Sequence, residues 1–118
     1  MTLPWWFPFG QVPEILAREL AARLSAQPPL QIVDVRSHFE FARDHIRGAV
    51  NVPLGAFRRR LDGLKLDRSR PVVAICLTGH RSIPAVRLLR RRGYDAFQLA
   101  GGMIAWRAAG LADAPGRG

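Results

Sequence analysis

The chain has 118 residues, of which 48% are hydrophobic, so the composition excludes a disordered chain and leaves room for a single domain. The net charge of +9 comes almost wholly from arginine, since Lys65 is the only lysine, a bias typical of a GC-rich bacterial genome. A basic surface attracts anions of every kind, so the charge alone singles out no partner.

The first eleven residues are rich in aromatic side chains, with Trp5, Trp6 and Phe7 between two prolines. We expect residues 1–11 to form an extension that packs onto its own domain, in preference to touching a membrane or docking a partner. The segment lacks the basic start of a signal peptide, and no apolar run approaches the roughly 20 residues that cross a bilayer, so we expect a cytoplasmic protein. The domain itself is predicted over residues 12–112, followed by a flexible tail, rich in proline and glycine, over residues 113–118.

Helical and strand patterns alternate along the rest of the chain. The first expected helix runs from Pro13 to about Pro28, with Leu16, Leu20 and Leu24 on one face. A short second helix is expected from Ser37 to Arg43, where Glu40 completes a capping box. Three more helices are expected over residues 56–64, 83–92 and 103–109. Gly93 is expected to close the fourth helix. The expected strands cover residues 31–35, 49–52, 71–76 and 96–99. This alternation predicts an α/β fold, with a mostly parallel central sheet and helices on both faces.

The only cysteine, Cys76, ends the most strongly apolar predicted strand. Ligands of parallel sheets bind outside the carboxyl ends of the strands. The loop that follows, over residues 77–81, can turn successive backbone N–H groups towards a negative atom, and Gly79 suits a turn that needs a positive φ. Positive charge comes from the start of the next helix and from the side chains of Arg81 and His80. This charge favours the thiolate over the thiol. A buried cysteine without a function is the alternative, but such a loop needs no thiol for packing.

The remaining polar residues favour structural interpretations. Asp34 and Arg36 follow a buried strand, so we expect them to orient loops through hydrogen bonds, and we expect His45 to be a structural histidine. With one cysteine and no metal-ligand spacing among the histidines, neither a metal nor another cofactor is expected. The arginine runs at residues 58–60 and 90–92 lack an aromatic stacking platform, so we expect no nucleic-acid binding.

Three groups of residues, over about residues 12–111, resemble the signatures of rhodanese-like domains. The first group is Asp34, Val35, Arg36, Glu40, His45, Ile46, Gly48, Ala49, Asn51 and Pro53; the second is Cys76, Gly79, Arg81 and Ser82; the third is Gly101, Gly102, Trp106, Gly110 and Leu111. The order and spacing of the three groups match the family.

The resemblance implies a single-domain sulfurtransferase of the rhodanese type. The thiolate of Cys76 would take the outer sulfur of an anionic donor such as thiosulfate, release sulfite, and pass the sulfur from a persulfide to cyanide, a thiol or an acceptor protein. The loop residues Leu77, Thr78, Gly79, His80 and Arg81 would bind the substrate through their N–H groups and the Arg81 charge, with Asp34, Arg36 and Ser82 in support.

Two positions depart from the family pattern. Asp44 stands where the family usually has glycine, and aspartate tolerates left-handed backbone angles, so the turn can survive. Leu77 occupies a loop position that is basic in some members, which leaves the preferred donor open.

Two other functions stay open at this point. Cysteine phosphatases and arsenate reductases place five residues between the cysteine and an arginine, whereas only residues 77–80 separate Cys76 from Arg81. The shorter loop fits a sulfane sulfur better than a phosphate. The second alternative is a rhodanese-like module without turnover of its own, which carries sulfur or binds a protein within a complex.

Overall fold

Five parallel strands form the central sheet of the computed structural model, which describes residues 3–28 and 30–112. The strands are β1 (Glu14–Ile15), β2 (Gln31–Asp34), β3 (Val50–Asn51), β4 (Val72–Ile75) and β5 (Ala96–Leu99). Their order across the sheet is β1-β5-β4-β2-β3, and all four neighbouring pairs are parallel. β4 is therefore the middle strand, with both edges hydrogen-bonded.

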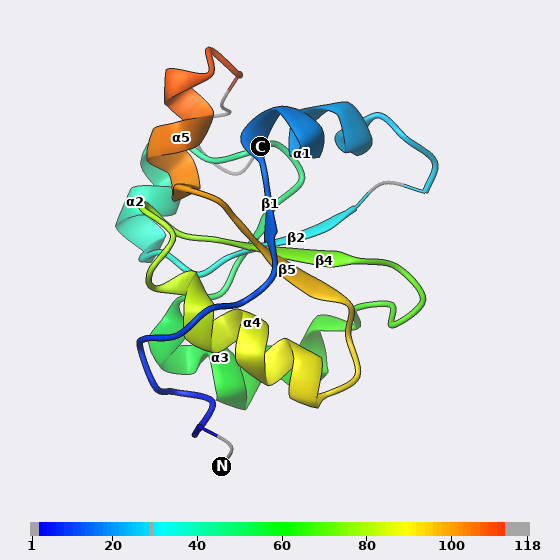
Figure 1. Cartoon of the computed structure of the whole chain (residues 1–118), viewed down its shortest axis with the longest axis vertical. Helices are drawn as coiled ribbons and strands as arrows, with labels where there is room; N and C mark the ends of the chain where they lie inside the picture. The colour runs from blue at the N-terminus through cyan, green and yellow to red at the C-terminus, as the bar shows by residue number, and fades with distance from the viewer. Residues whose placement is uncertain (1–2, 29, 113–118) are drawn as a thin grey trace.

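Helices cover both faces of this sheet. They are α1 (Ala17–Leu24), α2 (His38–Arg43), α3 (Leu54–Arg60), α4 (Ser82–Arg91) and α5 (Gly102–Ala108), and a short 3-10 helix, η1 (Leu61–Leu64), continues α3. Figure 1 shows α3 and α4 on one face of the sheet, and α1 and α5 on the other. The α/β fold predicted from the sequence is confirmed.

The alternation of side chains along β4 divides the core into two layers. Val72, Ala74 and Cys76 belong to the cluster that packs against α3 and α4, whereas Val73 and Ile75 belong to the cluster beneath α1 and α5. Successive side chains of a strand point to opposite faces. The same alternation carries Cys76 to the face of the sheet that α4 covers.

The prediction of a helix from Pro13 is wrong. Residues 14–15 form β1, the helix begins at Ala17, and Leu16 is 67% exposed in place of lying on an apolar face. The backbone of this segment bonds to the next strand, since Gln98 N–H donates to the carbonyl of Pro13 (2.9 Å) and Ala100 N–H to that of Ile15 (2.9 Å). A strand of two residues is too short to give an alternating pattern, so only its pairing with β5 identifies it.

The other elements follow the predicted order with shifted bounds. The capping box of α2 is present, with Ser37 Oγ accepting from Glu40 N–H and the Glu40 carboxylate accepting from Ser37 N–H. The helix predicted over residues 56–64 begins two residues earlier and ends as the 3-10 helix, and the strand predicted over residues 49–52 keeps only Val50–Asn51. Gly93, with φ +91°, lies just beyond the last turn of α4.

The N-terminal arm, defined here as residues 3–11, lies against α4 (Figure 1). Arg87 of α4 donates to the carbonyls of Pro4, Trp5, Phe7 and Phe9 at 2.6–3.4 Å. Trp5 packs against the core cluster, as expected of this segment, whereas Trp6 (60%) and Phe9 (67%) remain exposed.

The predicted tail, residues 113–118, lies outside the described residues, and the domain boundaries at residues 12 and 112 remain predictions. Across residues 3–28 and 30–112, no helix has the length and apolar character needed to span a membrane.

Candidate active site

The loop that carries Cys76 follows the carboxyl end of the middle strand and leads directly into α4. Its first two residues are held by the start of α5, because Met103 N–H donates to the carbonyl of Cys76 (2.9 Å) and Ile104 N–H to that of Leu77 (3.0 Å). Gly79, with φ +95°, makes the turn that the sequence predicted. A Cβ atom at Gly79 would come within 3.3 Å of the Gly101 nitrogen, so the loop and the β5–α5 connection are closely packed.

The sulfur of Cys76 is enclosed by this loop, and the residue is 1% exposed. Gly79 N–H donates to Sγ at 3.0 Å, and Ser82 Oγ lies 3.4 Å from it. Among the described residues, Gly79 supplies the single backbone N–H bond to Sγ. The binding of a persulfide by the N–H groups of residues 77–81 stays a prediction. A backbone N–H at a buried sulfur stabilises negative charge there.

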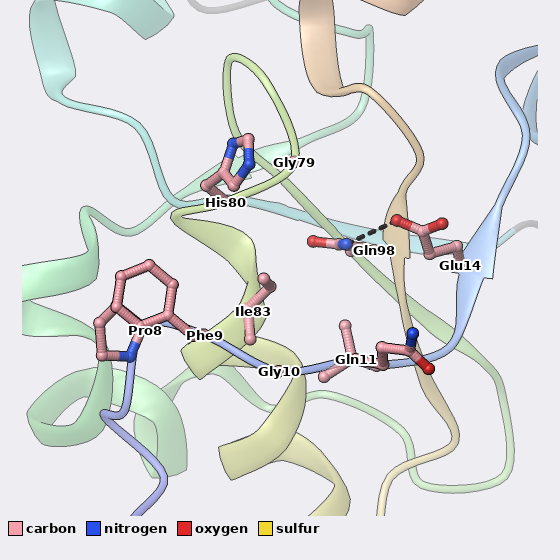
Figure 2. A pocket seen from close by; sticks show the side chains of 10 residues that line it. Pro8, Phe9, Gly10, Gln11, Glu14, Gly79, His80, Ile83 and Gln98 are labelled. Carbon is pink, nitrogen blue, oxygen red and sulfur yellow. Dashed lines mark hydrogen bonds between the residues drawn. The ribbon is translucent and has the colours of Figure 1, made fainter.

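A series of hydrogen bonds that the sequence did not indicate leads from the buried Ser82 to the exposed Glu14. The Ser82 hydroxyl donates to Gln98 Oε1 (2.6 Å), and Gln98 Nε2 donates to Glu14 Oε2 (2.7 Å), as Figure 2 shows for the second bond. Because a carboxylate only accepts, Glu14 fixes which end of the Gln98 amide faces Ser82. Because the hydroxyl has one proton, Ser82 can donate a hydrogen bond to Cys76 Sγ only if its bond to Gln98 Oε1 breaks. In the sequence, only the polar Gln98 within the otherwise apolar strand β5 pointed to these hydrogen bonds.

Arg81 is joined to α2. Its guanidinium forms two bonds of 2.8 Å with the Glu40 carboxylate, one to each oxygen. These bonds lower the pKa of Glu40 to about 2 and raise the pKa of Arg81. The sequence assigned Glu40 only to the capping box and Arg81 to binding the donor, whereas in the structure the pair connects the loop to α2.

The other loop side chains point outwards or pack at the rim. Thr78 and His80 are exposed and bond to each other, with 2.9 Å between Oγ1 and Nδ1. Leu77 is half-buried against the cluster beneath α1 and α5. The His80 ring also lies beside a cavity next to the loop (Figure 2).

Asp34 and Arg36 form a buried pair close to the loop. Arg36 Nε lies 3.0 Å from Asp34 Oδ1, and its NH2 group lies 2.8 Å from Oδ2, with both residues no more than 1% exposed. Burial opposes the charge, but the hydrogen bond and charge of Asp34, helped by nearby carboxylates, raise the pKa of Arg36. The Asn51 amide donates to the carbonyls of both residues. These contacts fit the loop-orienting role expected from the sequence.

Asp44 does not take the left-handed backbone considered from the sequence. Its φ of −166° and ψ of 150° are extended, and its carboxylate bonds to Arg107 of α5 and lies 3.7 Å from Arg36 NH1. An aspartate at this position therefore adds an ion pair between α2 and α5.

His45 lies fully buried in the turn after α2. Its Nδ1 is 2.8 Å from the carbonyl of Phe41 and its ring stacks on the Phe41 ring at 3.7 Å, while Nε2 has no hydrogen-bond partner among the described residues. Within residues 3–28 and 30–112, no three histidine, cysteine, aspartate or glutamate side chains gather as a metal site would require.

Comparisons with known proteins agree with this geometry. The chain is 35% identical over 104 residues to an HTH-type transcriptional regulator of Mycobacterium tuberculosis, covering 86% of this chain but only 45% of that protein. It is also 35% identical over 101 residues to a sulfurtransferase of Allochromatium vinosum, covering 85% of this chain and 92% of the relative.

Among solved structures, a rhodanese-related protein from Thermoplasma volcanium superposes with a TM-score of 0.78 at 27% identity, over 87% of this chain and 98% of that one. The family model of the rhodanese-like domain matches residues 16–109, which include the Cys76 loop and the β5–α5 connection packed against it. The chain belongs to the family of rhodanese-like domains.

Proposed function

We propose that this protein is a sulfurtransferase that carries a sulfane sulfur as a persulfide on Cys76. The observation that carries the proposal is a single thiol, at the end of the middle strand, whose buried sulfur accepts a backbone N–H from Gly79 at 3.0 Å. Relatives named as sulfurtransferases support the same reaction class.

The transfer takes place in two displacements. The Cys76 thiolate attacks the outer sulfur of thiosulfate, a bond forms to Sγ, and the S–S bond of the donor breaks with its electron pair leaving on sulfite. An acceptor thiolate or cyanide then attacks the outer sulfur of the persulfide, and the electron pair of that S–S bond returns to Sγ. A covalent intermediate divides one difficult transfer into two easier steps. No net oxidation occurs, and no cofactor is needed.

The loop contacts suggest a role for each neighbour. Gly79 N–H stabilises negative charge on Sγ in the free thiolate and again when the acceptor leaves with the outer sulfur, and Ser82 lies against the sulfur from the side of α4. We assign Arg81 to holding the loop through Glu40, with the overall positive charge of the chain attracting the anionic donor.

Intact mass after incubation with thiosulfate tests the proposal. We expect one added sulfur atom that a thiol reductant removes, and we expect Cys76→Ser to stay folded and to gain nothing, because a hydroxyl cannot form a persulfide. Transfer by a folded Cys76→Ser variant, or no added sulfur on the native protein, would overturn the assignment.

Two further assays separate the alternatives. An aryl phosphate should not be cleaved, because a phosphatase loop must offer donors to three oxygens, and here the loop has one residue fewer and Arg81 is engaged by Glu40. Cys76-dependent phosphate release at a rate comparable to sulfur transfer would favour the phosphatase. Sulfur loading without turnover to cyanide or a thiol would instead identify a carrier that acts only within a complex.

A further inference from the structure

A cavity of about 550 Å³ lies beside the Cys76 loop, on the side of the N-terminal arm. Phe9 and Gly10 of the arm form one wall, and Gly79 and His80 of the loop form the opposite one, as Figure 2 shows. The arm lies outside residues 16–109, which the family model covers. Cavities of this size hold small organic molecules, and thiosulfate or cyanide would fill only a fraction of it.

Glu14 is the acidic residue that lines this cavity. One carboxylate oxygen accepts from Gln98 Nε2 at 2.7 Å, and no arginine or lysine within the described residues pairs with Glu14. Ion pairs with arginine do form at the other described acidic residues apart from Glu19, namely Asp34, Glu40, Asp44, Asp62, Asp67 and Asp95. In a chain with 18 lysine and arginine residues, an uncompensated carboxylate in a cavity favours a cationic ligand.

The cavity and the sulfur share a wall. Gly79 lines the cavity and its N–H contacts Sγ, while Gln98 lines the cavity and binds Ser82, which lies 3.4 Å from Sγ. Three short contacts, from Glu14 to Gln98, from Gln98 to Ser82 and from Ser82 to Sγ, thus connect Glu14 to the sulfur. Ile83, 7% exposed, adds an apolar surface between the two ends.

We propose that this cavity binds the sulfur acceptor, and that the acceptor is a small thiol with a cationic amino group. The ammonium group would lie against Glu14, the carbon chain against Phe9 and Ile83, and the thiolate towards the persulfide. The acceptor thiolate attacks the outer sulfur, the S–S bond to Cys76 breaks, and its electron pair returns to Sγ, leaving the acceptor as a persulfide. This inference rests on the proposed sulfur transfer, and it adds the class of acceptor.

Competition between two acceptors in a Glu14→Gln variant tests the charge contact. Cysteamine carries the ammonium group and 2-mercaptoethanol is its neutral counterpart, so the ratio of their kcat/KM values on one enzyme cancels their different nucleophilicities when variants are compared at one pH. The amide oxygen introduced by the substitution can still accept from Gln98, which preserves the hydrogen bond. We expect that ratio to fall about two- to fivefold, the effect of removing one exposed charge contact.

Glu19→Gln is the matched control, because Glu19 also forms no ion pair with a described residue but lies on the exposed surface of α1, away from the cavity. It should leave the ratio unchanged. An unchanged ratio in Glu14→Gln, or an equal fall in both variants, would overturn the inference.

A labelling experiment makes the test independent of sulfur transfer. Aminoethyl methanethiosulfonate reacts with the Cys76 thiolate to form a mixed disulfide and release methanesulfinate, and its sulfonatoethyl counterpart differs in charge. We expect Glu14→Gln to lower the ratio of the cationic to the anionic labelling rate by a similar factor. The control variant Glu19→Gln should leave this ratio unchanged. If thiosulfate fails to load Cys76 but the labelling ratio falls, the proposed sulfur transfer is wrong and the site for a cationic ligand is still supported. An unchanged labelling ratio in Glu14→Gln would contradict the cationic site.

Discussion

Gly102 determines where the backbone of Cys76 can lie. A Cβ atom at Gly102 would come within 2.5 Å of the carbonyl oxygens of Cys76 and Leu77, and the φ of Gly102 is +61°. Contacts this short are made with backbone atoms, so a side chain at Gly102 must displace the loop itself.

We therefore expect Gly102→Ala to destabilise the protein by about 1–3 kcal/mol and to slow sulfur loading from thiosulfate. Gly110→Ala is the matched control, because Gly110 also has a positive φ (+74°) but no described atom lies within 4 Å of its added Cβ. Chemical denaturation and the rate of mass gain measure the two effects. Equal stability losses with equal loading rates in both variants would show that the contact with the loop does not matter.

At the level of elements, the Arg81–Glu40 pair joins the start of α4 to the first turn of α2. The two bonds of 2.8 Å connect residues that are 41 positions apart in the sequence. Because Glu40 also caps α2 through Ser37, loss of its charge would weaken both contacts at once.

The lowered pKa of Glu40 predicts how stability depends on pH. The carboxyl has a pKa of about 2 in the folded protein against an ordinary 4.5, so its contribution is fully present above pH 4.5 and is lost as the pH falls towards 2. Urea unfolding midpoints measured from pH 6 to pH 3 should fall more steeply for the native protein than for Glu40→Gln, which has no carboxyl to protonate. Parallel pH profiles for the two proteins would contradict this assignment.

At the scale of the whole molecule, Arg87 makes most of the described side-chain bonds that hold the N-terminal arm on α4. Arg87 donates to four carbonyls between Pro4 and Phe9, and the arm in turn forms a wall of the cavity beside the loop. Backbone carbonyls in an arm without regular strands or helices have few other partners, and Arg91 of α4 adds one bond, to the carbonyl of Leu3.

We expect Arg87→Ala to release the arm while the sheet stays folded. Hydrogen–deuterium exchange should become faster in peptides covering residues 3–11 and stay unchanged in peptides covering β4. Arg58→Ala, at an exposed arginine of α3, serves as the control and should alter neither. Unchanged exchange in the arm of Arg87→Ala would mean that the packing of Trp5 and the Arg91 bond are enough to hold it.

Local patterns in the sequence were sufficient for the α/β fold and for the position of Cys76. The apolar run of residues 72–75 and the periodic apolar residues of α4 depend only on neighbours in the chain, and so does the capping box of Ser37 and Glu40. For the same reason, the sequence correctly placed Cys76 at the end of a buried strand, with Gly79 at a positive φ.

The tertiary structure decided which distant residues meet. Glu14 and Gln98 are 84 positions apart, and Glu40 and Arg81 are 41 apart, so no window of the sequence contains either pair. β1 exists only because its backbone pairs with β5, and Asp44 is extended because its carboxylate finds arginines from two other segments. The sequence thus determined the fold and the position of Cys76 with its neighbours Gly79 and Ser82, whose signals are local, whereas folding alone assembled the more distant contacts of the loop and the cavity beside it.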